Sequence, residues 1–132
     1  MSAFVLSQLA QAYVLTGEQR RAVELAQNAV DLARRHDLKG YEAWSLYSLA
    51  KIYAVDAPSD AQASYQQALR LAKTLGMRPI EALSHLGLGE LAHQSSQHVV
   101  AREELMTAAV MFRGMGMNLW VNKTEAALAE LC

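Results

Sequence analysis

A repeat of about 40 residues constrains this sequence more than any other feature. Three segments carry a small residue inside the same apolar pattern, in nearly equal steps, at Ala10, Ala50 and Gly89. A second pattern follows each segment with the same period, and it begins at Ala22, Ala61 and Ala101. Two separate patterns with one period indicate a chain built from stacked copies of one supersecondary unit.

The spacing inside each copy is helical. Apolar residues recur every three or four positions, as at Leu6, Leu9 and Tyr13, which places them on one side of a helix. No stretch alternates apolar and polar residues as a half-buried strand does. We therefore predict an all-α fold with helices at about 2–15, 19–37, 41–55, 60–75, 80–94, 97–113 and 118–131.

Turn and capping residues stand near the ends of these helices. Gly76 and Gly114 suit the positive φ that often follows the last residue of a helix. The other glycines expected between helices are Gly17 and Gly40. Ser59 with Gln62 fits a capping box, and Pro79 fits the first turn of a helix, where its missing N–H costs nothing.

Small residues at fixed positions allow two helices to cross closely. We expect the small residue of each first helix, such as Ala50, to face the alanine of the second, such as Ala61. One helix pair cannot bury its own apolar face, so the pairs must stack. Residues 1–132 then form one domain, with repeats at about 2–40, 41–78 and 79–117 and a capping helix at about 118–131.

The charge balance and the single cysteine narrow the partners and the compartment. Lys plus Arg number 12 and Asp plus Glu 13, so the formal net charge is −1. A nucleic-acid-binding protein usually carries a basic excess, so we predict no nucleic-acid partner. Cys132 is the one cysteine, which excludes an internal disulfide and favours a reducing, cytoplasmic location. No apolar run approaches the ~20 residues that span a bilayer, so we predict no membrane partner.

These patterns resemble the tetratricopeptide repeat, whose small-residue and alanine positions match best in the first two copies. The bulky aromatic that is typical near the start of the first helix is replaced here by Leu6, Leu46 and His85. The long period resembles the C-terminal repeat regions of bacterial signalling ATPases, regulators with a LuxR-type domain and nucleotide cyclases. The run from Met111 to Leu128 is very similar to the final repeat of such proteins.

The resemblance implies a right-handed superhelical stack of three antiparallel helix hairpins, in which the first helix of each pair lines a concave groove. The residues that would face this groove are Phe4, Ser7, Gln11, Trp44, Tyr47, Lys51, Leu83, Leu86, Glu90 and His93. Aromatic side chains often anchor interfaces, so Trp44 and Tyr47 should be partly exposed unless they pack between neighbouring first helices.

We predict a non-catalytic scaffold that binds a protein or peptide in this groove. The alternative is a ligand-sensing module of a larger bacterial ATPase, cyclase or transcription regulator. An enclosed apolar pocket would favour the ligand sensor, and an open surface with a polar rim would favour a peptide.

No group of residues indicates an enzyme, a metal or a cofactor. The run Gly87-x-Gly89-x-x-Ala92 matches a dinucleotide fingerprint, but it lies inside an expected helix, so we assign it to helix packing. His93 and His98 are expected on either side of a turn, without further metal ligands. Three methionines are expected to fill the seam before the closing helix, and they are Met111, Met115 and Met117.

The N-terminal helix is apolar on more than one side. Its apolar residues include Phe4, Val5, Leu6, Leu9 and Val14. A repeat stack needs a polar outer side at each end. Either an upstream segment covers this surface or two copies meet there, so we predict a homodimer formed through residues 1–15.

Overall fold

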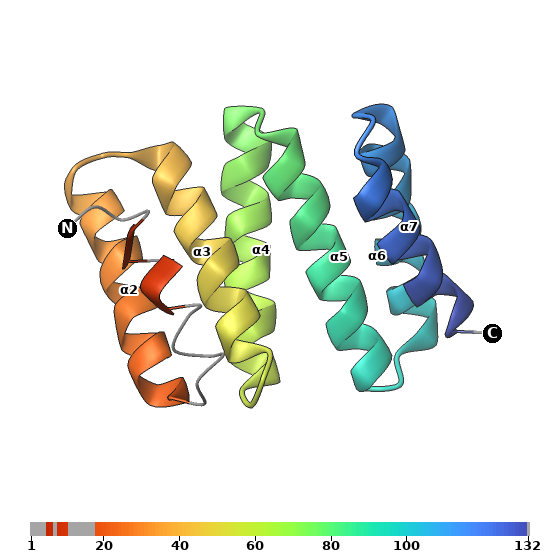
Figure 1. The fold of residues 1–132 in the computed structure, drawn as a ribbon, viewed down its shortest axis with the longest axis horizontal. Helices are drawn as coiled ribbons and strands as arrows, with labels where there is room; N and C mark the ends of the chain where they lie inside the picture. The colour runs from red at the N-terminus through yellow and green to blue at the C-terminus, as the bar shows by residue number, and fades with distance from the viewer. Residues whose placement is uncertain (1–4, 7, 11–17, 132) are drawn as a thin grey trace.

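The computed structural model describes residues 5, 6, 8–10 and 18–131 of the chain, and the secondary structure of these residues is all helical. Residues 5, 6 and 8–10 are helical, and longer helices follow in chain order. These are α2 (Gln19–Arg35), α3 (Lys39–Tyr53), α4 (Pro58–Leu75), α5 (Arg78–Gln94), α6 (His98–Gly114) and α7 (Asn118–Ala129). They lie side by side in chain order along the long axis of the molecule (Figure 1).

The expected all-α class is confirmed, and the six helices after residue 18 lie within two residues of the predicted limits. Consecutive helices pack on one another, and α3 also contacts α5. Most of the expected helix at 2–15 and the turn at Gly17 lie outside the described residues. Within the described part of the chain, no helix is both long and apolar enough to cross a membrane.

Three of the expected capping positions are wrong. Gly40 is the second residue of α3 rather than a residue between helices. Gly114 is the last residue of α6, and positive φ falls instead on Gly116, at 69°. Ser59 does not cap α4, because this helix already begins at Pro58 and its N-terminal cap makes no side-chain hydrogen bond. Proline suits the first helical position, so the helix begins earlier than the capping box predicted.

Four of the turns close in the same way. Each contains a residue with φ between 52° and 70°, and these residues are Asp37, Gly76, Ser96 and Gly116. The next residue donates its N–H to the carbonyl five positions back, at 2.8 to 3.0 Å, in the pairs Leu38–Ala33, Met77–Ala72, Gln97–Ala92 and Met117–Phe112. These bonds satisfy carbonyls at the end of the helix and set the direction of the next one.

The buried seam between helices is built on the small residues of the repeat. The alanines at positions 10, 22, 50, 61 and 101 are all fully buried. Gly89 is also buried, but its nearest neighbour across the helix contact is Leu105 rather than Ala101: an added methyl group would lie 2.7 Å from the Leu105 side chain. A methyl group added at Gly87 would collide with the ring of Tyr65. The glycines of the fingerprint-like run therefore serve packing inside α5, as predicted.

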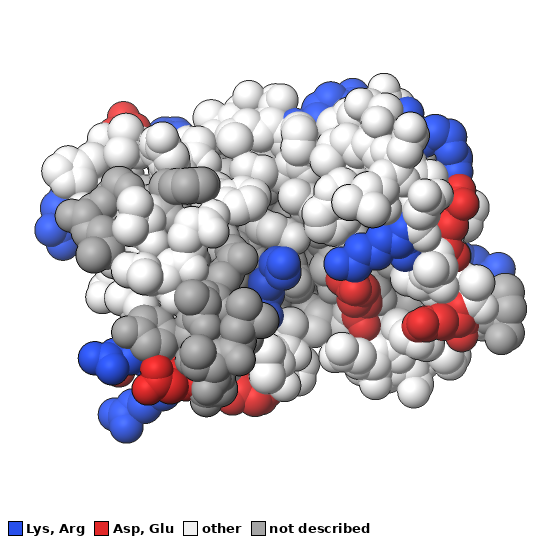
Figure 2. Space-filling view, viewed as in Figure 1, with Lys and Arg blue, Asp and Glu red and all other residues white. Residues whose placement is uncertain are grey.

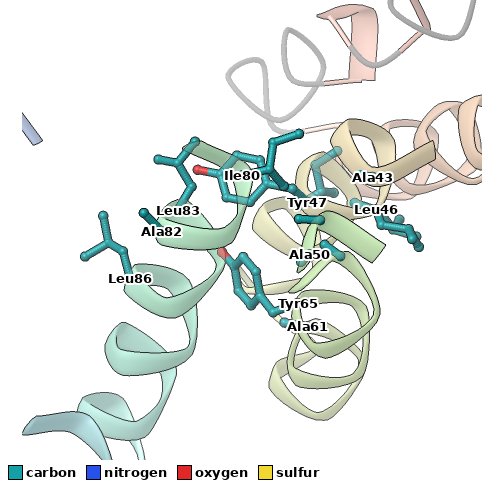
Figure 3. Packing of buried hydrophobic residues seen from close by; sticks show 14 of the residues in the cluster. Ala43, Leu46, Tyr47, Ala50, Ala61, Tyr65, Ile80, Ala82, Leu83 and Leu86 are labelled. Carbon is teal, nitrogen blue, oxygen red and sulfur yellow. The ribbon is translucent and has the colours of Figure 1, made fainter. Parts of the chain in front are cut away.

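Larger side chains fill the spaces between these small residues. Figure 3 shows the rings of Tyr47 and Tyr65 in the space between α3, α4 and α5, with Leu83 beside Tyr47. Near the C-terminal end, Phe112 is fully buried and stacks on Trp120 at 5.7 Å between ring centroids. The three methionines before α7 pack partly buried against this core, which confirms their predicted place in the seam.

The closing helix keeps the register of the helices before it. Ser45, Ser84 and Thr124 are fully buried and follow each other at the spacing of the repeat. The Thr124 hydroxyl donates to the carbonyl of Trp120 at 2.7 Å, which lets a polar side chain be buried inside the helix contact. The helix α7 thus occupies the same position relative to α6 as α5 occupies relative to α4. It extends the layer of helices formed by α3 and α5.

Candidate functional site

The helices α3, α5 and α7 expose a shared surface, which we call the α3–α5–α7 face. Its accessible or half-buried members are Trp44, Lys51, Glu90, His93, Lys123 and Glu130. Three of the predicted groove residues, Phe4, Ser7 and Gln11, lie outside the described residues. Figure 2 shows basic and acidic side chains close together in the middle of this view, over α3, α5 and α7.

The apolar groove residues of the prediction are part of the core. Leu83 and Leu86 are buried, and Tyr47 is 6% exposed, so of the two alternatives for Tyr47 the structure shows the packed one. Tyr47 is held between Trp44 and Tyr65, with ring centroids 5.8 and 6.0 Å away. Burial is also the main cause that raises the pKa of the Tyr47 hydroxyl above its usual range, with a smaller contribution from Glu90. Tyr47 therefore supports the face from below.

Trp44 is an aromatic side chain of this face that keeps solvent contact. It is half-buried on α3, and its ring packs against Tyr47. Its indole Nε1 is buried without a hydrogen-bond partner among the described residues. An indole N–H without a partner costs free energy that a carbonyl oxygen could recover. Trp44 thus presents part of an apolar ring to solvent, while its N–H lies beneath the surface.

Three charged residues alternate in sign across the face, from Lys51 on α3 to Glu90 on α5 and Lys123 on α7. Partial burial raises the pKa of Glu90, and the two lysines act in the opposite direction. Partial burial and the charge of Lys123 lower the pKa of Lys51, while Glu90 raises it. Among the described residues, no ion pair within 4.0 Å joins the three, so their polar atoms remain available to a ligand.

Each lysine lies over an aromatic ring. Lys51 Nζ is 5.7 Å from the centroid of Tyr47, and Lys123 Nζ is 5.0 Å from that of Trp120. A cation over a ring face is attracted by the ring quadrupole. The rings restrain the two ammonium groups on either side of Glu90, so the charges have defined positions.

His93 extends the face toward the C-terminal end of α5. Its Nε2 lies 3.8 Å from Glu130 Oε2, and its Nδ1 is buried without a partner among the described residues. The ring of His98 is 6.2 Å away across the turn between α5 and α6, where the sequence placed a turn between the two histidines. A search of the described residues finds no cluster of three or more His, Cys, Asp or Glu side chains that could hold a metal ion.

The sequence prediction missed two residues of the face, Lys123 and Glu130. Lys123 lies on α7 and Glu130 directly follows this helix, which the prediction treated only as a cap. The repeat spacing contains the signal that could have found them, since Lys123 lies one repeat after Leu83 and Glu130 lies one repeat after Glu90. Extending the register by one more helix would have placed both side chains on the same surface.

The opposite side of the molecule has a separate hollow of about 310 Å³ between α4, α5 and α6. Polar side chains such as Gln62, Gln66 and Glu104 line it together with Leu88 and Leu91. Its lining is therefore mixed rather than purely apolar. An enclosed apolar pocket would favour a small-molecule sensor, and the polar side chains that line this hollow do not fit that description.

His85 shows why the third copy departs from the repeat pattern. It occupies the place of Leu6 and Leu46. Its Nδ1 lies 2.7 Å from Glu104 Oε2, and both side chains are largely buried. A short polar contact between α5 and α6 has replaced an apolar one, and it ties the two helices together.

Neither a comparison with protein-family models nor a comparison with curated proteins finds a match for this sequence.

Proposed function

We propose that this protein is a non-catalytic interaction module that binds an extended segment of a partner protein along the α3–α5–α7 face. The observation that carries the proposal is the row Lys51, Glu90 and Lys123, which crosses three helices of one layer beside the half-buried Trp44. An aromatic anchor next to fixed charges of both signs suits a peptide, which offers backbone carbonyls and side chains of either charge.

The alternation of charge supports a protein partner over a nucleic acid. A surface that tracks a phosphate backbone presents successive lysines and arginines without acidic residues between them. Here Glu90 separates the two lysines of the row, and the net charge of the chain is −1. We further propose that the helices wind as a right-handed superhelix of the tetratricopeptide type, because the small-residue positions of that repeat coincide with the buried seam.

A ligand-sensing role within a larger bacterial regulator is the second proposal. The hollow between α4, α5 and α6 has a volume at the lower end of the range for small-molecule sites. Its glutamine-rich lining offers donors and acceptors to a polar ligand. The α3–α5–α7 face has the better case, because it combines a half-buried aromatic side chain with opposite charges.

Selection of short random peptides on the immobilised protein would test the first proposal. A selected peptide should lose about tenfold in affinity with Trp44→Ala or Lys123→Ala, which corresponds to ~1.4 kcal/mol. The matched control is Gln66→Ala, at an exposed position of α4 in the hollow on the opposite side. Peptides that bind Trp44→Ala and Lys123→Ala as well as the wild type, and lose affinity with Gln66→Ala, would move the site to the hollow.

A further inference from the structure

The helix α6 carries an exposed apolar stripe on the side away from the core. Val99, Met106 and Val110 are 72%, 53% and 64% exposed. Viewed down the helix axis, these three residues lie together with Glu103 and Arg113 within an arc of about 80°. The fully buried Ala108 lies on the opposite side of the same helix. The stripe is therefore a continuous surface feature rather than a set of scattered apolar residues.

The two earlier helices of the same layer give an internal comparison. The positions equivalent to this stripe are polar and exposed, with Arg20, Gln27 and Asp31 on α2 and Ser59, Gln66 and Arg70 on α4. Both α2 and α4 are followed by further helices of the array, and these positions still remain exposed. An additional repeat would therefore leave the stripe of α6 uncovered as well. The apolar residues are specific to α6 and call for a partner from outside the array.

The charges on either side of Met106 and Val110 identify that partner by complementarity. Counted from Ala108, Glu103 lies five residues before and Arg113 five residues after, while Met106 lies two before and Val110 two after. When two copies of α6 run antiparallel around a twofold axis at the level of Ala108, Glu103 meets Arg113 of the second copy and Met106 meets Val110 of the second copy. The arrangement joins opposite charges at both ends and apolar side chains in the middle.

The ion pair that Arg113 already makes is compatible with this arrangement. Arg113 Nη2 binds Glu125 Oε1 at 2.8 Å, and both side chains remain more than half exposed. The guanidinium has five N–H donors, so it can hold a second carboxylate. The arginine can therefore keep its contact with α7 while it binds Glu103 of a second copy.

We propose that this protein forms a homodimer through antiparallel pairing of the α6 stripes of two copies. One helix from each copy makes a small interface, below the ~800 Å² per partner of a typical stable complex, so the dimer dissociates at low concentration. This interface is distinct from the N-terminal one that the sequence predicted, and it leaves the α3–α5–α7 face uncovered.

Sedimentation velocity of the full chain over a wide concentration range tests the proposal. The expected mass rises from 14.5 kDa toward twice that value as the concentration increases. Val110→Glu should weaken association at least tenfold, because it places an acidic side chain against Met106 of the second copy in the apolar middle of the interface. The matched control Arg70→Glu introduces the same residue at the equivalent position of α4 and should leave association unchanged.

A charge exchange gives a second, independent readout. Glu103→Arg alone should weaken the dimer, because it opposes Arg113 of the second copy. Combining it with Arg113→Glu reverses both charges and should restore association. A wild-type chain that stays monomeric at high micromolar concentration would overturn the proposal. So would a dimer that resists Val110→Glu but dissociates with Leu9→Glu, since its interface would then be N-terminal. Circular dichroism should show unchanged helicity for each variant, because all of these positions are exposed.

Discussion

The buried seam and the α3–α5–α7 face use the same repeat spacing in opposite ways. In the seam, equivalent positions hold equivalent residues, as with Ser45, Ser84 and Thr124, which are all small hydroxyl residues and all fully buried. On the face, equivalent positions hold different chemistry. The clearest cases are Trp44 and Lys123 in one register, and Lys51, Glu90 and Glu130 in another.

This difference separates the residues that hold the array together from those that distinguish one helix from the next. A helix contact accepts only side chains that fit the available space, so packing restricts the seam to a few small residues. An exposed position has no such restriction, and it can be occupied by whatever a partner requires. Changes in the seam should therefore alter stability, and changes on the face should alter binding at nearly constant stability.

The largest effect on stability is expected from Phe112→Ala. Phe112 is fully buried and stacks on Trp120, so its removal leaves a cavity between α6 and α7. The expected loss is about 3–5 kcal/mol, measured by urea unfolding. Thr107→Ala, at an exposed position of α6, is the control and should change the free energy of unfolding by under ~0.5 kcal/mol. Equal effects of the two substitutions would remove the distinction between seam and surface.

Ala50→Leu should cost less, about 1–3 kcal/mol, because it overpacks the contact between α3 and α4. Ala50 and Ala61 are both fully buried there, and the backbones must separate to admit the larger side chain. Thermal unfolding measures the change, with Lys51→Leu at the next, exposed position as the control. A melting temperature that does not fall with Ala50→Leu would show that the register of this seam is wrong.

Trp44→Ala tests whether a change on the α3–α5–α7 face alters binding more than stability. The substitution should lower the affinity for a peptide selected on the wild type about tenfold, and it should leave the helical circular dichroism signal intact. The half-buried ring loses contact with Tyr47, so the free energy of unfolding should fall less than with Phe112→Ala. A loss of fold comparable to that of Phe112→Ala would assign Trp44 to the seam.

The smallest effect concerns Glu90 and depends on pH. Burial raises the pKa of Glu90 above the ordinary value of 4.5, so the folded state holds this proton more tightly than the unfolded state. Its contribution to stability is present below pH 4.5 and is lost as pH rises through the folded-state pKa. Glu90→Gln should therefore gain stability relative to the wild type across that range, as measured by urea unfolding at a series of pH values. A difference that grows instead as the pH falls would contradict the burial of Glu90.

The sequence predicted the helices well, because their signals are local. The helices are indicated by apolar side chains that recur every three or four positions, and the seam is indicated by the small residues of the repeat. Gly76 and Pro79 mark the turn between α4 and α5. The other turns were harder to predict. Asp37 and Ser96 adopt positive φ without being glycines, and tertiary packing decides such positions more than residue type does.

The candidate site was predicted only in part, for a physical reason. Residue type and register place Tyr47, Leu83 and Leu86 on the inner side of their helices, but they do not say whether a neighbouring helix covers them. All three are buried in the hydrophobic core. Lys51 and Glu90 were predicted to lie on the surface of these helices, but the prediction did not include Lys123, whose charge acts on both of them.

Binding of a protein segment along the α3–α5–α7 face is measured most directly by a ¹⁵N NMR titration with a peptide selected on the protein. We expect the indole N–H of Trp44 and the backbone amides around Lys51, Glu90 and Lys123 to shift together and to saturate with one affinity. Amides around Gln62 and Gln66 on α4 should stay in place. Shifts confined to α4 and α6, with an unperturbed Trp44 indole, would contradict the claim.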